Sequence, residues 1–202
     1  MLLSSAGKRP VEASHECFDH IADTRIQTGA EETNMHPPLY CIQGLPAGQV
    51  SIMARPRGGD WLLNDIKAIR SADVDVLVSL LTPDEVMELE LREEAECCRH
   101  QEVIYLSFPI PDRRTPLFSE RTFTFLEQLH RQVIAGKHVV LHCRQGLGRA
   151  ALMAASVLVL SGFSPDQAFE RLSSVRGYPV PETEEQRAWV VAFSRSQRSF
   201  PD

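Results

Sequence analysis

The sequence lacks a long apolar run, an excess of basic charge and a regular cysteine framework. Its longest apolar stretch, residues 150–160, is too short to cross a bilayer, so we expect no membrane-spanning segment. The formal net charge of −6 argues against a general nucleic-acid binder. The five cysteines have neither the spacing of metal ligands nor that of a disulfide scaffold. This pattern predicts no metal site and favours a reducing, cytoplasmic compartment.

The remaining composition is that of an ordinary globular protein. Hydrophobic residues make up 43% and charged residues 24% of the 202 positions, which is enough for one substantial core. Residues 1–36 are polar and weakly periodic, and they predict a flexible or loosely docked N-terminal extension. The dipeptide Pro37-Pro38 marks a break. We expect residues 37–202 to form a single, monomeric domain.

Strand and helix patterns alternate from residue 39 onwards. Short apolar stretches predict strands at residues 39–42, 49–54, 74–81, 103–108 and 138–142. Helix-start signals lie between them, including Thr82-Pro83-Asp84-Glu85 and a predicted cap at Asp60 for a helix with Leu62, Leu63, Ile66 and Ile69 on one face. The alternation predicts an α/β fold, with a central, mostly parallel, twisted sheet of four to five strands and helices on both faces.

Residues 139–150, with the sequence VVLHCRQGLGRA, predict a buried strand, a glycine-containing turn and the start of an apolar helix. Cys143 lies at the turn, and Arg149 lies where the helix begins. The N–H groups of such a turn converge on one point and favour an anion there, so a cysteine at this position is stabilised as the nucleophilic thiolate. The planar guanidinium of Arg149 is suited to hold two oxygens of a phosphate group.

Asp112 is the candidate proton donor for such a site. A phosphate ester attacked by sulfur needs a proton on its leaving oxygen, which calls for a carboxylic acid on a separate loop. Asp112 follows the predicted strand 103–108, and ligands of parallel sheets bind beyond the carboxyl ends of the strands. Pro-Asp is also a common turn dipeptide. The adjacent Arg113 and Arg114 are either solvated loop charges or contacts for an anionic substrate, and both interpretations stay open.

The motif His-Cys-x5-Arg with an upstream loop aspartate resembles the cysteine-dependent protein-tyrosine and dual-specificity phosphatases, over about residues 39–193. The stretches FPIPDRRTP and HCRQGLGRA are most similar to the kinase-associated phosphatase branch of the dual-specificity group. This resemblance implies a protein phosphatase that needs neither cofactor nor metal. Its expected substrate is a phosphorylated protein, at tyrosine and, by extension, at serine or threonine.

The resemblance also assigns roles to individual residues. It implies that Cys143 forms a cysteinyl-phosphate while Asp112 acts first as acid and then as base. The phosphate oxygens are expected to contact the loop formed by Arg144, Gln145, Gly146, Leu147, Gly148 and Arg149.

Three further residues have supporting roles in this interpretation. His142 is expected to orient the loop through a hydrogen bond rather than act as a base. Gln186 either positions the attacking water, as in many relatives, or forms a capping box with Thr183. Ala150 stands where active relatives usually carry Ser or Thr, as it does in the phosphatases of regenerating liver. The missing hydroxyl predicts slow hydrolysis of the intermediate.

Three alternatives stay open at the level of sequence. The chain is a slow or inactive phosphate-binding regulatory module, a phosphatase of phosphoinositides or small phosphate esters, or a rhodanese-like sulfur-transfer domain. The last of these would have no need of Asp112.

Overall fold

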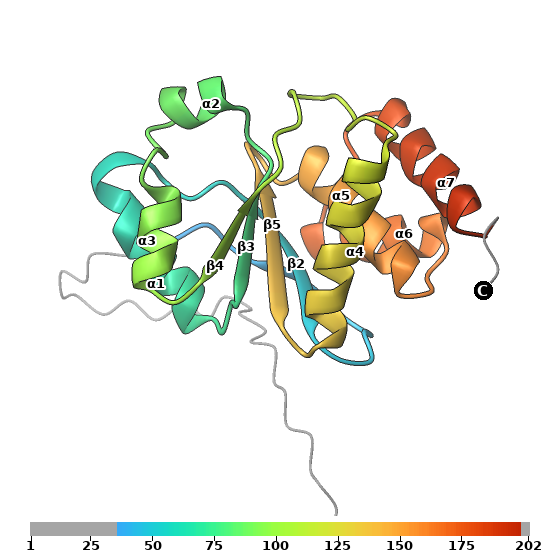
Figure 1. The fold of residues 1–202 in the computed structure, drawn as a ribbon, viewed down its shortest axis with the longest axis horizontal. Helices are drawn as coiled ribbons and strands as arrows, with labels where there is room; N and C mark the ends of the chain where they lie inside the picture. The colour runs from blue at the N-terminus through green and yellow to red at the C-terminus, as the bar shows by residue number, and fades with distance from the viewer. Residues whose placement is uncertain (1–35, 199–202) are drawn as a thin grey trace, which may run out of the picture. The chain divides into compact units, whose positions relative to one another are not determined.

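The computed structural model describes residues 36–198 and is built around a five-stranded sheet in the order β1-β2-β5-β3-β4 (Figure 1). The β1–β2 pair is antiparallel, whereas the other three pairs are parallel. This confirms the predicted mostly parallel sheet. Of the predicted N-terminal extension, residues 1–35 lie outside the described range. The strands are β1 (Tyr40–Ile42), β2 (Gln49–Ala54), β3 (Val76–Ser79), β4 (Ile104–Ser107) and β5 (His138–Cys143).

Helices cover both faces of the sheet, as expected for strands joined by parallel crossovers (Figure 1). One face carries α1 (Leu62–Ser71) and α3 (Glu94–His100), while α2 (Pro83–Glu88) lies beyond the carboxyl ends of the strands. The other face carries α4 (Glu120–Ile134), α5 (Arg149–Leu160), α6 (Pro165–Arg176) and α7 (Glu184–Arg198). No helix within residues 36–198 is long and apolar enough to cross a membrane.

Strand β5 and helix α5 are both deeply buried. All six residues of β5 are buried, and this strand pairs with β2 on one side and β3 on the other. In α5, every residue from Arg149 to Leu158 is buried. The alanines of this helix are small, which allows α4, α6 and α7 to pack closely against it. The turn that joins β5 to α5 is therefore anchored at both ends by the core.

Two cores result from the alternation of side chains along β5. Val139, Leu141 and Cys143 belong to the core beneath α4–α7, whereas Val140 belongs to the core beneath α1 and α3. A strand with apolar residues on both faces is typical of a sheet that is covered on both sides. The pattern places the Cys143 side chain on the α5 side of the sheet and turns its neighbour His142 toward the opposite side.

The helix start predicted at Thr82-Pro83-Asp84-Glu85 is confirmed. Thr82 and Glu85 form a reciprocal capping box at α2, and Ser164 forms another with Gln167 at α6. The predicted cap at Asp60 is wrong, because Asp60 lies inside a short 3-10 helix, Gly59–Trp61, that precedes α1. This extra turn changes the buried face of α1. Leu63 is exposed, and Asp65 is buried instead, where it accepts hydrogen bonds from Arg57.

Candidate active site

Cys143 is the last residue of β5, and its sulfur faces the turn that follows. The backbone N–H of Gly146 donates a hydrogen bond to the Cys143 Sγ, with an N–S distance of 3.3 Å. Gly146 has φ +73°, and a Cβ atom built on it would lie 2.5 Å from the Met53 carbonyl oxygen. A side chain is therefore excluded by both backbone conformation and space. The glycine allows the turn to lie against β2 and to direct an N–H toward the sulfur.

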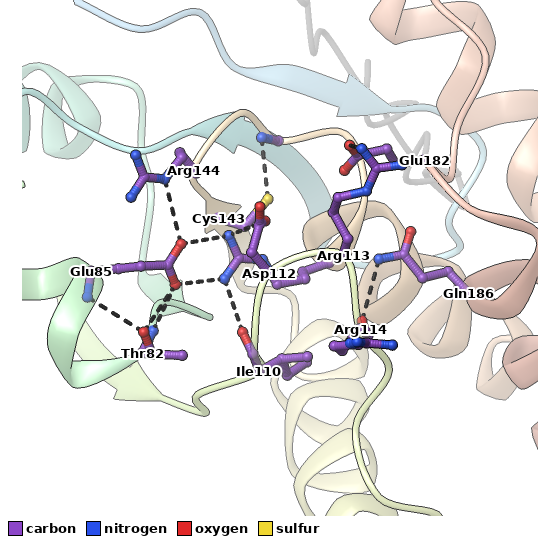
Figure 2. A network of polar contacts seen from close by, with 12 residues as sticks. Thr82, Glu85, Ile110, Asp112, Arg113, Arg114, Cys143, Arg144, Glu182 and Gln186 are labelled. Atoms are coloured by element: carbon purple, nitrogen blue, oxygen red, sulfur yellow. Dashed lines mark hydrogen bonds and ion pairs between the residues drawn. The ribbon is translucent and has the colours of Figure 1, made fainter.

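Arg149, the first residue of α5, is buried. It has three partners, Glu85, Ile110 and Asp112, which are labelled in Figure 2. Its guanidinium forms a two-pronged ion pair with Glu85, with N–O distances of 2.7 and 2.9 Å. It also donates to the Ile110 carbonyl oxygen at 2.9 Å, and its Nη2 lies 2.8 Å from Asp112 Oδ1. Burial by itself lowers the pKa of Arg149, but the hydrogen bond and charge of Glu85, together with the charges of Cys143 and Asp112, raise the pKa overall. The guanidinium is thus a permanently charged and oriented group.

Glu85 is a site residue that the sequence interpretation missed. It was recognised only as part of the capping box, and it does accept a hydrogen bond from the Thr82 N–H at 3.0 Å. The same carboxylate also holds Arg149. Burial alone would raise the pKa of Glu85, but the hydrogen bonds from Arg149 and the Thr82 backbone lower it to about 2. The glutamate of the TPDE sequence is the one feature of the sequence that points to this position. A capping box, however, does not reveal that the glutamate has a second partner distant in the chain.

The predicted proton donor lies across from Glu85, on the loop that follows β4. The Asp112 side chain is 56% exposed and contacts the guanidinium of Arg149. The loop turns through a hydrogen bond from the Arg114 N–H to the Pro111 carbonyl oxygen at 3.0 Å, and Arg113 adopts a left-handed conformation with φ +59°. Sheet topology therefore brings Asp112 to the same edge as Cys143, as the sequence predicted.

A cavity of about 240 Å³ joins these groups. Most of the predicted catalytic and phosphate-binding residues line it; the lining consists of Asp112, Arg113, Cys143, Arg144, Gln145, Leu147, Gly148, Arg149 and Glu182. Gly146 is buried and contributes its N–H, whereas Ala150 is fully buried in the first turn of α5. Within residues 36–198, no group of three or more His, Cys, Asp or Glu side chains is placed to hold a metal ion.

The two arginines that follow Asp112 differ in their surroundings. Arg113 lines the cavity, and its Nη1 lies 3.6 Å from Glu182 Oε1 (Figure 2). The Arg114 side chain is exposed and is not part of the lining, although its carbonyl oxygen accepts a hydrogen bond from Gln186. Of the two arginine side chains, Arg113 is the one that lines the cavity. Glu182, which was not predicted, adds a carboxylate to the rim.

Gln186 forms the capping contacts that were considered for it. Its Oε1 accepts from the Thr183 N–H at 3.3 Å, while its own N–H donates to Thr183 Oγ1 at 3.2 Å. The buried amide also lies against Gly148, because a Cβ atom built there would be 3.0 Å from both amide heavy atoms. The described contacts are those of a cap beside the loop. The role in positioning water stays a prediction.

His142 does not form the hydrogen bond to the loop that we expected. Both ring nitrogens are buried and lack an aligned hydrogen-bond partner. Its Nε2 instead lies 3.0 Å from Oε1 of Glu94, a residue of α3 that is also fully buried. The strand alternation that places Cys143 on the α5 side explains why the histidine ring turns toward α3.

Comparison with known proteins identifies a phosphatase family and a relative. Residues 51–163, more than half of the chain, match the family model "Polymorphic toxin system, DSP-PTPase phosphatase". The chain is 25% identical over 131 residues to cyclin-dependent kinase inhibitor 3 of Rattus norvegicus. This match covers 64% of the chain and 61% of the rat protein, so the chain spans about three fifths of that relative's length.

Solved structures show the same fold. The kinase-associated phosphatase, in a variant whose catalytic-site cysteine is replaced by serine, superposes with a TM-score of 0.72 at 20% identity, over 85% of this chain and 100% of that one. Tk-PTP in its active form gives a TM-score of 0.59 at 25% identity, over 78% of this chain and 96% of that one. With the family model matching most of the region between β2 and α6, the chain belongs to the DSP-PTPase phosphatase family of polymorphic toxin systems.

Proposed function

We propose that this chain hydrolyses phosphate monoesters on protein side chains, with Cys143 as the nucleophile. The observation that carries the proposal is the convergence of three groups on one cavity: the Cys143 sulfur, the Arg149 guanidinium and the Asp112 carboxylate. They supply a nucleophile, a charge that stabilises phosphate oxygens and a group able to donate a proton. These are the parts that phosphoryl transfer to a cysteine requires.

In the first step, the Cys143 thiolate attacks phosphorus. The S–P bond forms, the bond between phosphorus and the leaving oxygen breaks, and Asp112 gives its proton to that oxygen. In the described structure Asp112 occupies one side of Arg149. We infer that the substrate phosphate replaces Asp112 on the guanidinium. The freed carboxyl of Asp112 can then face the leaving oxygen, to which it gives its proton.

In the second step, water hydrolyses the cysteinyl-phosphate. Asp112, now a carboxylate, takes a proton from the water while the S–P bond breaks and Cys143 leaves as a thiolate. A hydroxyl at position 150 would stabilise that leaving thiolate, but Ala150 provides none. We therefore expect formation of the intermediate to be faster than its hydrolysis.

Rapid mixing with p-nitrophenyl phosphate tests this scheme. We expect a burst of p-nitrophenol that approaches one equivalent per chain, followed by slow turnover, together with a phosphorylated Cys143 peptide that mass spectrometry identifies. Cys143→Ser should abolish the burst and the label. A burst that persists in Cys143→Ser would refute the assignment of the nucleophile.

A second candidate function rests on Ala150. A chain that accepts phosphate but releases it slowly can serve as a regulatory module that captures phosphorylated partners. A burst without measurable turnover on any substrate would favour this module over the phosphatase. Turnover should be measured on a panel of substrates that contains phosphotyrosine and phosphothreonine peptides and a phosphoinositide. The preference among these substrates decides whether protein or lipid is the substrate class.

We further propose that the chain works as a monomer in the cytoplasm. The chemistry of the site supports a reducing compartment such as the cytoplasm, since Cys143 is a free thiol and must stay reduced to act as a nucleophile. Cys97 and Cys98 are free thiols as well, and both lie on α3, on the opposite side of the sheet from Cys143. Size-exclusion chromatography with light scattering measures the oligomeric state, and a mass above that of one chain would contradict the monomer.

A further inference from the structure

One peptide group of the phosphate-binding loop, residues 144–149, is held from both sides. This peptide joins Gln145 to Gly146, and its N–H donates to the Cys143 sulfur. Its carbonyl oxygen accepts a hydrogen bond from Nη2 of Arg176 at 3.4 Å. Because a trans peptide is planar, its N–H and its C=O point in opposite directions. A group that holds the carbonyl oxygen on the far side of the peptide therefore keeps the N–H directed at the sulfur.

The backbone of the loop does not fix this orientation by itself. Gly146 has φ +73°, and glycine adopts positive and negative φ about equally readily. Rotation of the peptide group about its two Cα atoms would turn the Gln145 carbonyl oxygen toward the cavity. The anion site would then lose one N–H donor and gain an oxygen that repels a phosphate. The productive orientation therefore depends on a contact from outside the loop.

The preceding peptide obtains such a contact from the sheet. The Arg144 carbonyl oxygen accepts a hydrogen bond from the Arg55 N–H, at 3.5 Å, just beyond the paired residues of β2 and β5. The Gln145 carbonyl lies one residue further on, and a side chain takes the place of the backbone donor there. Two successive carbonyl oxygens of the loop are thus bound by groups that follow β2 or belong to α6.

Arg176 is well supported for this role. Its Nη1 donates to the Tyr40 hydroxyl at 3.0 Å, and its guanidinium carbon lies 4.3 Å from the centre of the Tyr40 ring. Tyr40 belongs to β1, which packs against α6. The buried Nε of Arg176 has no hydrogen-bond partner within residues 36–198. The contacts with Tyr40 and Gln145 therefore set the orientation of the guanidinium.

Arg176 also lies in the last turn of α6, where a basic side chain commonly interacts with the carbonyl groups at the helix end. Its contacts run instead to β1 and to the loop. Gly177 ends the helix in a left-handed conformation, and its N–H donates to the Ser174 carbonyl oxygen. A role at the helix end would affect stability alone, whereas a contact with the loop would also affect anion binding.

We propose that Arg176 is a positioning residue that holds the Gln145 carbonyl away from the cavity and thereby keeps the Gly146 N–H directed at the anion site. Arg176 is not among the residues that line the cavity, so it acts through this peptide and does not touch substrate. The inference rests on the proposed function, which makes the loop the phosphate site. It names a residue from another helix that prepares the loop.

Calorimetric titration with tungstate, an unreactive tetrahedral dianion, tests this role without any phosphatase assay. Arg176→Met removes the guanidinium but keeps an unbranched stem that can lie on Tyr40. We expect the dissociation constant for tungstate to rise about tenfold, as for the loss of one hydrogen bond to a charged group. An unchanged constant in folded Arg176→Met overturns the inference. If Arg176→Met does not fold, Arg176→Gln, which keeps a polar group for the Tyr40 hydroxyl, is subject to the same criterion.

Arg171 provides a matched control on the same helix. Its guanidinium carbon lies 4.7 Å from the centre of the Phe163 ring, and it donates to the Gln43 carbonyl oxygen at 2.8 Å. Arg171→Met therefore removes the same charge and the same kinds of contact, but none of them to the phosphate-binding loop. It should leave the tungstate affinity unchanged. Equal losses in Arg171→Met and Arg176→Met would assign the effect to the packing or charge of α6 and refute the positioning role.

Salt separates the peptide contact from simple attraction between Arg176 and the anion. The screening length falls from about 10 Å at 0.1 M salt to about 3 Å at 1 M salt. We expect the loss in Arg176→Met to persist at 1 M sodium chloride, because the orientation of the peptide does not depend on long-range attraction. A loss that disappears at 1 M would overturn the inference.

The outcome for Arg176 is independent of the outcome for the reaction. Weaker tungstate binding by Arg176→Met, in a chain that hydrolyses no phosphate ester, would support the positioning role while refuting the proposed function. Hydrolysis by the unchanged chain, together with unaltered tungstate binding by Arg176→Met, would refute the positioning role and leave the proposed function standing.

Discussion

The two sides of the active-site cavity differ in how firmly their charged groups are held. On one side, Arg149 is 1% exposed and is bound by Glu85 and by the Ile110 carbonyl oxygen. On the other side, Asp112 is 56% exposed, and its ion pair is with the same arginine that a phosphate must contact. The groups for binding phosphate are therefore fixed before substrate arrives, whereas the proton donor must exchange its partner during the reaction.

Substitution of the fixed side should have the largest effect. Arg149→Lys keeps a positive charge but cannot form the two-pronged pair with Glu85 and contact a phosphate at the same time. We expect kcat/KM to fall on the order of 10²–10³-fold. Steady-state kinetics with p-nitrophenyl phosphate measures this. A loss of less than about threefold would mean that charge alone is sufficient and that the fixed geometry matters little.

The exposed side should show an effect that depends on the leaving group. Asp112→Asn cannot donate a proton, so hydrolysis of a phosphothreonine peptide should slow on the order of 10²-fold. The loss for p-nitrophenyl phosphate should be smaller, because p-nitrophenolate leaves readily without a proton. Parallel kinetics on the two substrates measure the difference. Equal losses would exclude a role as general acid, and no loss would favour the sulfur-transfer alternative.

The fixed side should also contribute to stability in a pH-dependent manner. The pKa of Glu85 falls from 4.5 to about 2 in the folded chain. Its stabilising contribution is therefore complete above pH 4.5 and is lost as the pH falls through about 2. We expect Glu85→Gln to lower the unfolding free energy at pH 7 by about 3 kcal/mol. Urea unfolding at a series of pH values should show the two proteins converging in acid.

Glu88→Gln is the matched control for that experiment. Glu88 lies one turn further along α2 and pairs with Arg144, but its side chain is 61% exposed. Surface pairs of this kind contribute little to stability. A loss as large as that of Glu85→Gln would remove the distinction between the buried and exposed pairs.

The smallest expected effect is a gain. Ala150→Ser supplies a hydroxyl where the leaving thiolate needs one, so steady-state turnover should rise about tenfold if hydrolysis of the intermediate limits the rate. Ala151→Ser adds the same hydroxyl one position further along α5, where the side chain points in a different direction and is also buried. It should give no gain. Unchanged turnover in Ala150→Ser would contradict slow hydrolysis as the reason for the burst.

The sheet, the strand-turn-helix unit and the positions of Cys143 and Arg149 could all be predicted from the amino-acid sequence. These features are local. A buried strand, a glycine that must have positive φ and an apolar helix each follow from a few neighbouring residues. Asp112 was also placed at the correct edge, because the carboxyl ends of parallel strands meet there. The predicted start of α1 was wrong, because an additional turn of 3-10 helix lies where the cap was expected.

The partners of these residues could not be predicted from the sequence, because they depend on long-range packing. Glu85 has a complete local explanation as a helix cap, and nothing in the neighbouring sequence shows that it also holds Arg149. Glu94 lies in an acidic segment that is typical of a solvated helix, yet it is buried against His142. Glu182 reaches the cavity from the loop before α7. Ion pairs between residues far apart in the chain depend on which helix face turns inward, and that orientation is fixed by packing of the whole domain.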